Sequence, residues 1–362
     1  MQETHNILGQ SKIYIFSPAG VVTGGVELLH QLCDILSVNG KEAYIVYYGT
    51  KAHEIPSDYR KYNLKTIESD KITDSEETVI VVPETRLCIL NDYKKAKAIV
   101  WWMSVDNYYV ALQANCAISF AYHLRYGVFS AYNSAVKVLA RKILRKRLYP
   151  SYSLSKLKKN RNVLCNAYQS EYANSFLKKH GITNTRPLSD YINDEYVFHQ
   201  ELVPKKENII IYNPKKGLRF TKRLIAAAPD LQWIPIQNMS RLEVKEMMCR
   251  AKLYIDFGHF PGKDRMPREA AMCGCCIITG KLGAAECAQD LPIDEKLYKF
   301  NQRNKDIPLI IQRIRFVLEN YETEIENFAD YRAVISGEKT VFVQDVREIM
   351  NSLISNGGGV RL

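Results

Sequence analysis

Short apolar runs that alternate with amphipathic helical patterns constrain the fold of this chain more than any other feature. The runs in the first half are Lys12–Ser17, Ala43–Tyr48, Thr78–Val82, Ala98–Met103 and Asn162–Asn166. After the first of them, Val26–Leu36 repeats leucine and isoleucine at the spacing of an amphipathic helix. Near-continuous apolar strands are typical of parallel sheets that helices cover on both faces. The sequence therefore predicts an α/β domain with a parallel sheet.

The same alternation restarts near residue 208 and predicts a second domain of this kind. Its expected strands are Asn208–Tyr212, Leu231–Ile236, Leu253–Phe257 and Cys275–Thr279. Its expected helices are Gly217–Ala228, Arg241–Cys249, Pro267–Met272 and most of Ile307–Ile354. Between the two series, Asn184–Lys206 contains two prolines and has no clear period, which favours a connection between domains.

We therefore expect four parts along the chain. They are an N-terminal Rossmann-like domain (1–188), a linker (189–207), a C-terminal Rossmann-like domain (208–335) and a C-terminal helix and tail (336–362). The tail is expected to pack back on the first domain. Ligands of such sheets bind at the carboxyl ends of the strands, so the loops that follow the predicted strands are the expected sites of chemistry.

The net positive charge is confined to one segment. The 64 residues from Asn107 to Ser170 hold no acidic side chain but 11 lysines and arginines, which equals the excess of 50 Lys and Arg over 39 Asp and Glu. This pattern excludes an evenly basic coat and indicates one local anionic partner. Within the segment, 134–161 is the most basic part, and Ser134–Tyr149 has the pattern of a basic amphipathic helix.

Two interpretations of this amphipathic helix stay open. Its apolar stripe consists of Val136, Leu139, Ala140, Ile143, Leu144 and Leu148. Its basic face includes Lys137, Arg141, Arg145 and Lys146. Either the stripe binds an anionic membrane surface, or ordinary docking on the first domain buries it.

Other features narrow the class of protein. Met1–Lys12 is polar and unlike a signal peptide, and no apolar run approaches the ~20 residues of a membrane-spanning helix. Nine cysteines then indicate reduced thiols in a cytoplasmic protein. Cys273 and Cys276 have C-x-x-C spacing, but no second pair stands at zinc-finger distance, so small buried side chains are favoured over a metal or redox site.

The loop Ser17–Gly25 follows the first predicted strand and ends in Gly24 and Gly25. Glycines at such a turn let the backbone approach a phosphate or sugar at a helix N-terminus, but they also simply make a tight turn. The spacing is not G-x-G-x-x-G, which disfavours a dinucleotide site, and no G-x-x-x-x-G-K-[ST] occurs, which disfavours a P-loop nucleotidase.

Two loops of the second half combine glycine with lysine. In Asn213–Gly217 (NPKKG), Lys215 and Lys216 precede a helix and are either phosphate contacts or part of an exposed turn. The richer loop, Asp256–Gly274, contains three cations, namely Lys263, Arg265 and Arg268. Such a density of charge among special backbone residues favours a functional loop.

Three residues of the loops Asp256–Gly274 and Trp101–Tyr109 each have two interpretations. Glu269, expected in the same first helical turn as Pro267, either complements the helix dipole or accepts two ribose hydroxyls. His259 is either a sugar contact or a surface residue. Asp106, in the loop Trp101–Tyr109, either acts as a general base toward an acceptor hydroxyl or, as we favour, caps the following helix.

Taken together, these loops resemble the GT-B glycosyltransferases, in particular the large bacterial nucleotide-sugar-dependent group, with family 4-like motifs. Thr23–Leu36 (TGGVELLHQLCDIL) is similar to the G-G-x-E first helix of that group, and NPKKG to its lysine–glycine phosphate element. Arg268–Ile278 (REAAMCGCCII) is similar to its E-A-M-A-x-G-x-P-V-I segment, and Gly283–Glu286 to the glycine loop that follows. The resemblance covers most of the chain and implies two Rossmann-like domains that face a cleft.

The resemblance also implies roles for matching positions. The implied donor-binding residues are Gly24, Gly25, Lys215, Lys216, His259, Lys263, Arg265, Glu269 and Gly283. Lys216 would contact the donor diphosphate, Glu269 would hold the ribose, and Gly283 would offer backbone amides near the donor. Gly24 and Gly25 would face the phosphate or acceptor from the first domain.

One position departs from the pattern of the group. Pro261 stands where the group often has a second glutamate, eight positions before Glu269, that contacts the donor sugar. Lys263 and Arg265 follow it and would neutralise the leaving diphosphate, so Arg265 joins Asp106 as a candidate catalytic residue. Retaining and inverting transfer both stay open. No D-x-D stands on a suitable loop, which predicts an enzyme without a metal or other cofactor.

The resulting hypothesis is a cytoplasmic glycosyltransferase in bacterial surface polysaccharide or glycoconjugate synthesis. It would use a nucleotide-sugar donor and a glycan or lipid-linked acceptor, and it would lie on the inner face of the cell membrane if the basic helix binds lipid. One alternative is a nucleotide-sugar epimerase, which needs no acceptor. Another is a nucleic-acid-binding protein, in which Tyr149 and Tyr152 stack on bases. That alternative leaves Glu269 and the glycine loops unexplained, so no nucleic-acid partner is expected.

Overall fold

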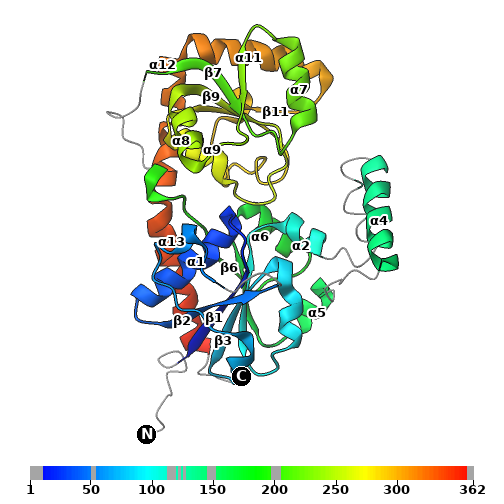
Figure 1. Ribbon diagram of the computed structural model, residues 1–362, viewed down its shortest axis with the longest axis vertical. Coiled ribbons are helices and arrows are strands. Elements are labelled where there is room, and N and C mark those ends of the chain that lie inside the picture. The colour runs from blue at the N-terminus through cyan, green and yellow to red at the C-terminus, as the bar shows by residue number, and fades with distance from the viewer. Residues whose placement is uncertain are drawn as a thin grey trace. The chain divides into compact units, whose positions relative to one another are not determined.

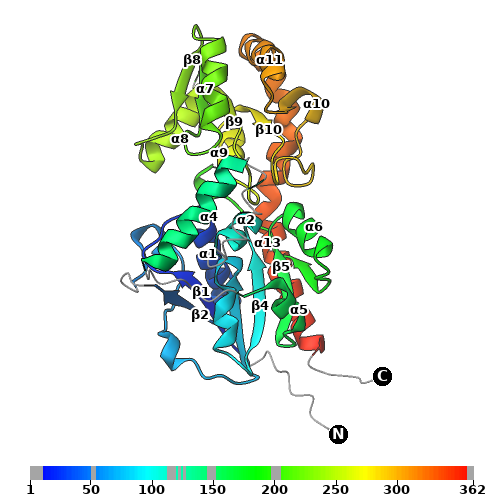
Figure 2. The ribbon, with the colours of Figure 1, turned by 90° about the vertical axis from the view of Figure 1, so that its right-hand side faces the viewer.

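The chain forms two compact units. The computed structural model describes residues 11–49, 54–111, 120, 124, 128–144, 152–196 and 205–356. The N-terminal unit comprises the chain up to Gln169, Ala173–Ser189 and the chain from Phe342, and the C-terminal unit comprises Ser170–Tyr172 and Asp190–Val341. Figures 1 and 2 show one sheet in each unit.

The N-terminal unit contains a six-stranded sheet in the order β2-β1-β3-β4-β5-β6. The strands are β1 (Lys12–Pro18), β2 (Glu42–Tyr48), β3 (Thr78–Pro83), β4 (Lys97–Trp102), β5 (Val163–Tyr168) and β6 (Thr185–Pro187). Every neighbouring pair is parallel. All six residues of β3 are buried, which explains why its sequence is apolar throughout instead of alternating.

Helices connect these strands. They are α1 (Gly24–Val38), α2 (Val105–Ala111), α4 (Val128–Ile143), α5 (Leu154–Lys159) and α6 (Glu171–Lys179). Helix α1 buries one continuous face, including Leu28, Leu29, Leu32 and Leu36, as its leucine spacing predicts. Helices α5 and α6, which precede and follow β5, are visible in Figure 2.

The C-terminal unit contains a five-stranded sheet in the order β11-β10-β9-β7-β8. Its strands are β7 (Glu207–Tyr212), β8 (Gln232–Pro235), β9 (Ala251–Asp256), β10 (Cys276–Gly280) and β11 (Lys299–Phe300). All pairs are again parallel. The centre of the core consists of fully buried isoleucines of β7 and β10 and the buried aromatic rings of Tyr254 and Phe257.

Helices lie on both sides of this second sheet. They are α7 (Leu218–Ala227), α8 (Arg241–Arg250), α9 (Arg265–Met272), α10 (Glu295–Tyr298), α11 (Ile307–Glu319) and α12 (Tyr321–Glu324). In Figure 1, α7 and α8 lie on opposite sides of β7 and β9. Helix α7 contacts α11, and α8 contacts α9. The last helix, α13 (Ala329–Asn356), contributes residues to both units.

The predicted architecture of two parallel-sheet α/β domains is confirmed. All nine predicted strands begin and end within two residues of their expected bounds. The two strands that the sequence did not predict, β6 and β11, have three and two residues, and so short a run has no recognisable period. None of the helices among the described residues is both long and apolar enough to cross a membrane.

Helix α4 exposes the apolar stripe of the basic segment. Phe129, Tyr132, Val136, Leu139 and Ile143 follow one another at spacings of three and four residues, and all are exposed, Phe129 at 81% and Ile143 at 72%. The helix instead buries Ala131 and Val138. The interpretation in which docking buries the stripe therefore does not hold for its described residues, since Val136, Leu139, Ala140, Ile143 and Leu144 are all exposed. Arg145, Lys146 and Leu148 lie outside the described residues.

Candidate functional site

The strand order of the C-terminal unit marks one place on its sheet for ligand binding. From β7 the chain moves to β8 on one side and then to β9 on the other side of β7. The loops that follow β7 and β9 therefore diverge at the carboxyl edge of the sheet, which is where ligands bind in open α/β sheets. These are the loops Asn213–Gly217 and Phe257–Asp264, two of the loops singled out in the sequence.

A lysine–aspartate pair joins the two loops. The Lys216 ammonium lies 2.5 Å from the Asp264 carboxylate, and both side chains keep some exposure, at 32% and 20%. Burial raises the pKa of Asp264, and the charge of Lys216 opposes that rise. The pair holds the ammonium over the carboxyl edge of β9, in a position to exchange its carboxylate partner for an external anion.

A second carboxyl group lies beneath this pair. Asp256, the last residue of β9, accepts hydrogen bonds from the Tyr254 hydroxyl (2.9 Å) and from the Gly258 N–H (2.7 Å). Burial, followed by the nearby charge of Asp264, raises the pKa of Asp256 to about 6. Its hydrogen bond to Gly258 fixes the turn by which the chain leaves β9.

Two glycines allow the loops to approach this closely. Gly217 has a left-handed backbone (φ 62°), and a Cβ atom there would lie 2.3 Å from the carbonyl carbon and oxygen of Phe257. Gly283 is also left-handed (φ 68°), and its Cβ would lie 2.1 Å from the carbonyl oxygen of Phe260. Only glycine fits at both positions, so the loops after β7, β9 and β10 are packed backbone to backbone.

The loop after β10 pairs with the loop after β9. The Phe260 N–H donates to the Leu282 carbonyl (3.1 Å), and the Ala284 N–H donates to the Phe260 carbonyl (2.9 Å). This contact brings His259 to Gly283, as the sequence-based assignment of both to one site requires. The His259 ring also packs edge-on against Tyr172, with ring centroids 6.1 Å apart.

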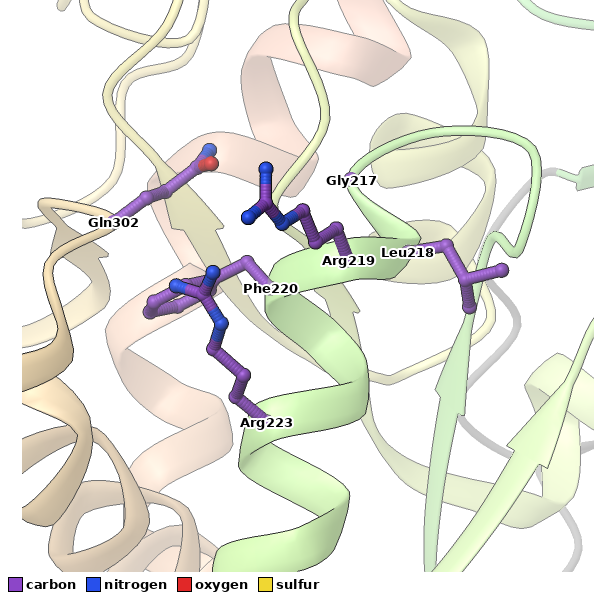
Figure 3. Close-up of a pocket in the computed structure, with 6 residues that line it drawn as sticks. All are labelled: Gly217, Leu218, Arg219, Phe220, Arg223 and Gln302. Carbon is purple, nitrogen blue, oxygen red and sulfur yellow. The ribbon is translucent and has the colours of Figure 1, made fainter.

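A cavity of about 310 Å³ adjoins this edge at the start of α7. Its lining residues are Gly217, Leu218, Arg219, Phe220, Arg223 and Gln302. Figure 3 shows the side chains of Arg219 and Gln302 pointing toward one another. The Gln302 amide donates to the Phe257 carbonyl (2.6 Å), and Arg223 donates to Asn304 (2.8 Å), whereas Arg219 has no ion-pair partner in the described part of the chain. Arg219 was missed by the sequence reasoning, although it lies two residues after Gly217.

The position of Glu269 in its helix differs from the prediction. Helix α9 begins at Arg265 after the N-cap residue Asp264, so Glu269 lies in the second turn rather than the first. The interpretation in which Glu269 complements the helix dipole from the first turn is therefore excluded. Arg265 occupies the first turn, half-buried, and one of its guanidinium nitrogens lies 3.4 Å from the Tyr191 carbonyl. Lys215 is an exposed residue of the turn before α7.

Two cations of the same loop belong to a buried ion cluster. Arg268 is fully buried and donates to Asp190 (2.6 Å) and to Glu338 (2.7 Å). Lys263 pairs with the second carboxylate of this cluster, Glu338, at 2.6 Å. The sequence suggested a functional loop from the density of its cations, but Arg268 ties three distant segments of the C-terminal unit together. Burial separates such a structural cation from a ligand-binding one, and sequence does not reveal it.

The N-terminal unit has its own polar groups at the carboxyl ends of its strands. Gly24 and Gly25 form the first turn of α1, and a Cβ atom at Gly25 would meet nothing within 4 Å. Asp106 is buried in the first turn of α2, but the residue that caps this helix is Ser104, whose hydroxyl accepts from the Asn107 N–H (3.3 Å). The favoured capping role of Asp106 is therefore wrong.

Glu84 is a further residue that the sequence reasoning missed. It directly follows β3 and accepts a hydrogen bond from the Met103 N–H (3.1 Å), just beyond β4. Its side chain is fully buried, and burial raises its pKa to about 8. Its position after Pro83, at the carboxyl end of a predicted strand, was a usable signal. Among the described residues, no cluster of three His, Cys, Asp or Glu side chains could hold a metal ion.

Comparison with known proteins identifies the fold. No protein-family model matches the sequence, and no curated protein sequence matches it either. Solved structures do match. Sucrose-phosphate synthase from Thermosynechococcus elongatus has a TM-score of 0.65 at 11% identity, with 96% of this chain and 100% of that chain covered.

Two further solved structures match over nearly their full lengths. A glycosyltransferase from Rickettsia africae has a TM-score of 0.60 at 12% identity, covering 96% of this chain and 99% of that one. HepE from Anabaena, solved with UDP-glucose, has a TM-score of 0.58 at 12% identity, covering 95% and 99%. The chain therefore has the two-domain, Rossmann-like α/β fold of the GT-B glycosyltransferases.

Proposed function

We propose that this chain is a glycosyltransferase that moves a sugar from a nucleotide-sugar donor to a hydroxyl acceptor. The observation that carries the proposal is the Lys216–Asp264 pair, held at the carboxyl edge of β7 and β9 by glycines that admit no side chain. An ammonium at such an edge suits the diphosphate of a nucleotide-sugar. The fold, shared with HepE in its UDP-glucose complex, supports the same assignment.

The chemistry asks for stabilisation of the leaving diphosphate. When the bond between the anomeric carbon and the phosphate oxygen breaks, negative charge develops on that oxygen. Lys216 would neutralise this charge, and the backbone N–H groups around Gly283 would add hydrogen bonds. In the free protein Asp264 keeps the ammonium in place, so little reorganisation is needed when the diphosphate arrives.

The other candidate residues receive roles as parts of this proposal. Glu269 would accept the ribose hydroxyls, and His259 would contact the donor sugar. Lys215, Lys263 and Arg265 would add positive potential around the phosphates, although Lys263 would first have to exchange its partner Glu338.

Two roles belong to the N-terminal unit. Gly24 and Gly25, at the exposed start of α1, would bind the acceptor or a phosphate through backbone N–H groups. Asp106 would take the proton of the acceptor hydroxyl as it attacks. Its buried position in α2 requires that the acceptor hydroxyl be brought to it.

Nucleotide release is the first experiment. The purified chain is incubated with UDP-, GDP-, ADP- or CMP-linked sugars, and the free nucleotide and the sugar products are measured with and without added acceptors. A glycosyltransferase gives acceptor-dependent release, whereas an epimerase gives an altered sugar nucleotide without acceptor. Unchanged turnover in all of Lys216→Ala, Arg265→Ala and Glu269→Ala would refute the site assignment.

The variant Lys222→Ala is the matched control for the lysine. Lys222 is an exposed residue of α7, the helix that begins two residues after Lys216. The Lys222→Ala substitution removes one positive charge from the same unit, as Lys216→Ala does. A loss of turnover in Lys222→Ala equal to that in Lys216→Ala would mean that net charge, not the site, is responsible.

We further propose that α4 attaches the protein to an anionic membrane surface. Five exposed apolar side chains follow one stripe of this helix, and the surrounding segment carries the net positive charge of the whole chain. A helix of this composition lies in the interfacial plane of a bilayer, with its apolar stripe among the acyl chains and its cations at the head groups. A lipid-linked acceptor would then be within reach of the enzyme.

Vesicle flotation tests this attachment. The chain is expected to float at low salt with vesicles that contain phosphatidylglycerol and to stay behind with pure phosphatidylcholine. Leu139→Asp should abolish flotation, and Leu309→Asp, which places the same charge at an exposed leucine of α11, should not. Equal flotation of both variants would contradict the role of the stripe.

A further inference from the structure

One buried tyrosine holds both backbone polar groups of the residue before the glycine turn of the N-terminal unit. Tyr59 ends the short 3₁₀ helix Ser57–Tyr59 and is 0% exposed. Its hydroxyl accepts a hydrogen bond from the Thr23 N–H (3.1 Å) and donates one to the Thr23 carbonyl (3.1 Å). Thr23 is the N-cap residue of α1, but its own side chain makes no capping hydrogen bond. The Tyr59 hydroxyl therefore fixes the start of α1 from a segment far away in the sequence.

The tyrosine ring is itself held in place. The ring of His30, a buried residue of α1, lies against it with ring centroids 4.3 Å apart. The two ring nitrogens of His30 are hydrogen-bonded to the Val26 carbonyl (2.7 Å) and to the Tyr47 hydroxyl of β2 (2.9 Å). The position of the Tyr59 hydroxyl is thus set by packing against α1 and β2, as a precisely placed polar group requires.

Two neighbours of this tyrosine hold the next turn of the helix. The Tyr62 hydroxyl donates to the Glu27 carboxylate (2.8 Å), and the Lys61 ammonium lies 3.2 Å from the same oxygen. Glu27 is buried in the first turn of α1. The segment 57–62 therefore contacts α1 at two points, and of these three side chains Tyr59 is the one bonded to the residue before the glycines.

The bonds of Tyr59 set the direction of the peptide group between Thr23 and Gly24. In a trans peptide the carbonyl and the following N–H point in opposite directions. Because the Thr23 carbonyl is turned toward the buried hydroxyl, the Gly24 N–H is turned away from it. The N–H groups at the first positions of a helix have no partner within the helix. Gly24 is half-buried and Gly25 is exposed, so these N–H groups lie where a ligand can approach.

Glycine makes this arrangement dependent on an outside constraint. A residue without Cβ occupies many backbone conformations with similar energy, so the peptide groups around Gly24 and Gly25 can rotate readily unless something holds them. A Cβ atom at Gly25 would meet nothing within 4 Å, which shows that packing does not supply the constraint there. The Glu27 N–H, which donates to the Thr23 carbonyl (3.0 Å), shares the task with Tyr59.

We propose that Tyr59 is a positioning residue, whose hydroxyl orients the Thr23–Gly24 peptide group so that the Gly24 N–H is presented to an oxygen atom of a substrate. The inference rests on the proposed glycosyl transfer, in which Gly24 and Gly25 bind the acceptor or a phosphate. Tyr59 itself would contact neither substrate. It would act by pre-organisation, since the N–H is already oriented when the substrate arrives.

Hydrogen exchange tests the orientation without any substrate. Tyr59→Phe in the full chain keeps the ring beside His30 but removes both bonds to Thr23. Mass spectrometry with fragmentation to single residues should find that the Thr23 N–H exchanges about 2- to 10-fold faster, the factor expected for the loss of one hydrogen bond. Tyr44→Phe is the matched control, because it loses a phenol bond to Glu42 (2.6 Å) near the amino end of β2, and it should leave this exchange unchanged. Wild-type exchange at Thr23 in Tyr59→Phe would overturn the proposal.

Steady-state kinetics test the consequence for the substrate. Tyr59→Phe should raise KM for the donor or for the acceptor by about 3- to 10-fold with little change in kcat, because a contact of equal strength in the ground state and the transition state is weakened. Tyr62→Phe removes a hydroxyl from the same segment but keeps both bonds of Tyr59, and it should retain the KM values of wild type. A purely structural role would give equal effects in the two variants, and equal effects, or wild-type KM values in Tyr59→Phe, would overturn the proposal.

Failure of the proposed function would look different. In that case wild type itself would show no acceptor-dependent release of nucleotide, whereas failure of the positioning role leaves turnover in wild type and the same KM values in Tyr59→Phe.

Discussion

The buried Arg268 cluster supports the sharpest prediction about stability. Arg268 is fully buried with its guanidinium 2.6 Å from Asp190 and 2.7 Å from Glu338, whose side chains are 0% and 3% exposed. Replacement by methionine roughly keeps the volume of the side chain but leaves two carboxylates in the interior. Lys263 stays as the ion-pair partner of Glu338. Removing one partner of a buried ion pair costs about 3–5 kcal/mol.

This cost translates into a large change in melting temperature. For a domain of this size, 1 kcal/mol corresponds to about 2–4 °C, so Arg268→Met should lower the melting temperature of the C-terminal unit by about 6–20 °C in differential scanning calorimetry. The control is Arg315→Met, which breaks a two-pronged but exposed pair with Asp230 in the same unit. Exposed pairs contribute little, so this variant should melt close to wild type.

The pH dependence of the two proteins should differ in a defined direction. Burial alone would raise the pKa of Asp190, but the charges of Arg268 and Lys263 outweigh it and hold the pKa below its ordinary value. In wild type this contribution is complete above the unfolded pKa of about 4 and is lost only below it. Without Arg268, burial raises the pKa of Asp190, so the deficit of Arg268→Met should grow between pH 5 and pH 8.

A second substitution separates charge from packing. In the Arg268→Met background, Asp190→Asn removes one of the uncompensated charges and should recover part of the lost stability at pH 7. The reasoning fails if the double variant is no more stable than Arg268→Met, or if Arg268→Met and Arg315→Met have the same melting temperature. In either case the buried ion cluster does not stabilise this unit.

Two further predictions concern backbone and carboxyl groups. Gly217→Ala should lower the free energy of unfolding by about 2–4 kcal/mol, because the left-handed backbone costs about 1–2 kcal/mol and the contact with Phe257 adds the cost of overpacking. Gly40→Ala, left-handed with open space around it, should lose only the backbone cost when both variants are measured by urea unfolding. Equal losses would show that the loops can move apart. Glu84→Gln should gain stability relative to wild type as the pH rises from 5 to 8. Burial raises the pKa of Glu84 to about 8, so the folded protein keeps this proton while the unfolded chain, whose Glu pKa is about 4, releases it, and rising pH favours unfolding of the wild type. A constant difference between the two proteins would contradict this.

Much of the architecture was predictable because it depends on patterns that the sequence displays. Buried parallel strands such as β3 have continuous apolar runs, and the leucine stripe of α1 gives its length and its inner face. Strands β6 and β11 were not predictable, because pairs formed by two or three residues are set by the neighbouring strand rather than by their own composition.

The site was only partly predictable, for a physical reason. Gly217, Gly283 and Lys216 could be selected because loops after strands are where ligands bind, and the structure brings them to one edge. The burial of individual side chains could not be predicted from the sequence. Arg268 and Arg265 look alike in sequence, yet one is an enclosed ion-pair partner and the other stands half-buried at the start of α9. The helix start at Arg265 likewise moved Glu269 out of the first turn.

The central claim is that the Lys216 ammonium at the β7–β9 edge binds the diphosphate of a nucleotide-sugar. Isothermal titration calorimetry of the nucleotide-sugar that gives activity tests it most directly, because binding is measured without an acceptor. Lys216→Ala should weaken binding by at least ~10-fold, the effect of a lost charge-assisted contact together with the unpaired Asp264 carboxylate it leaves behind, while Lys222→Ala should bind as wild type. Wild-type affinity in Lys216→Ala would contradict the account.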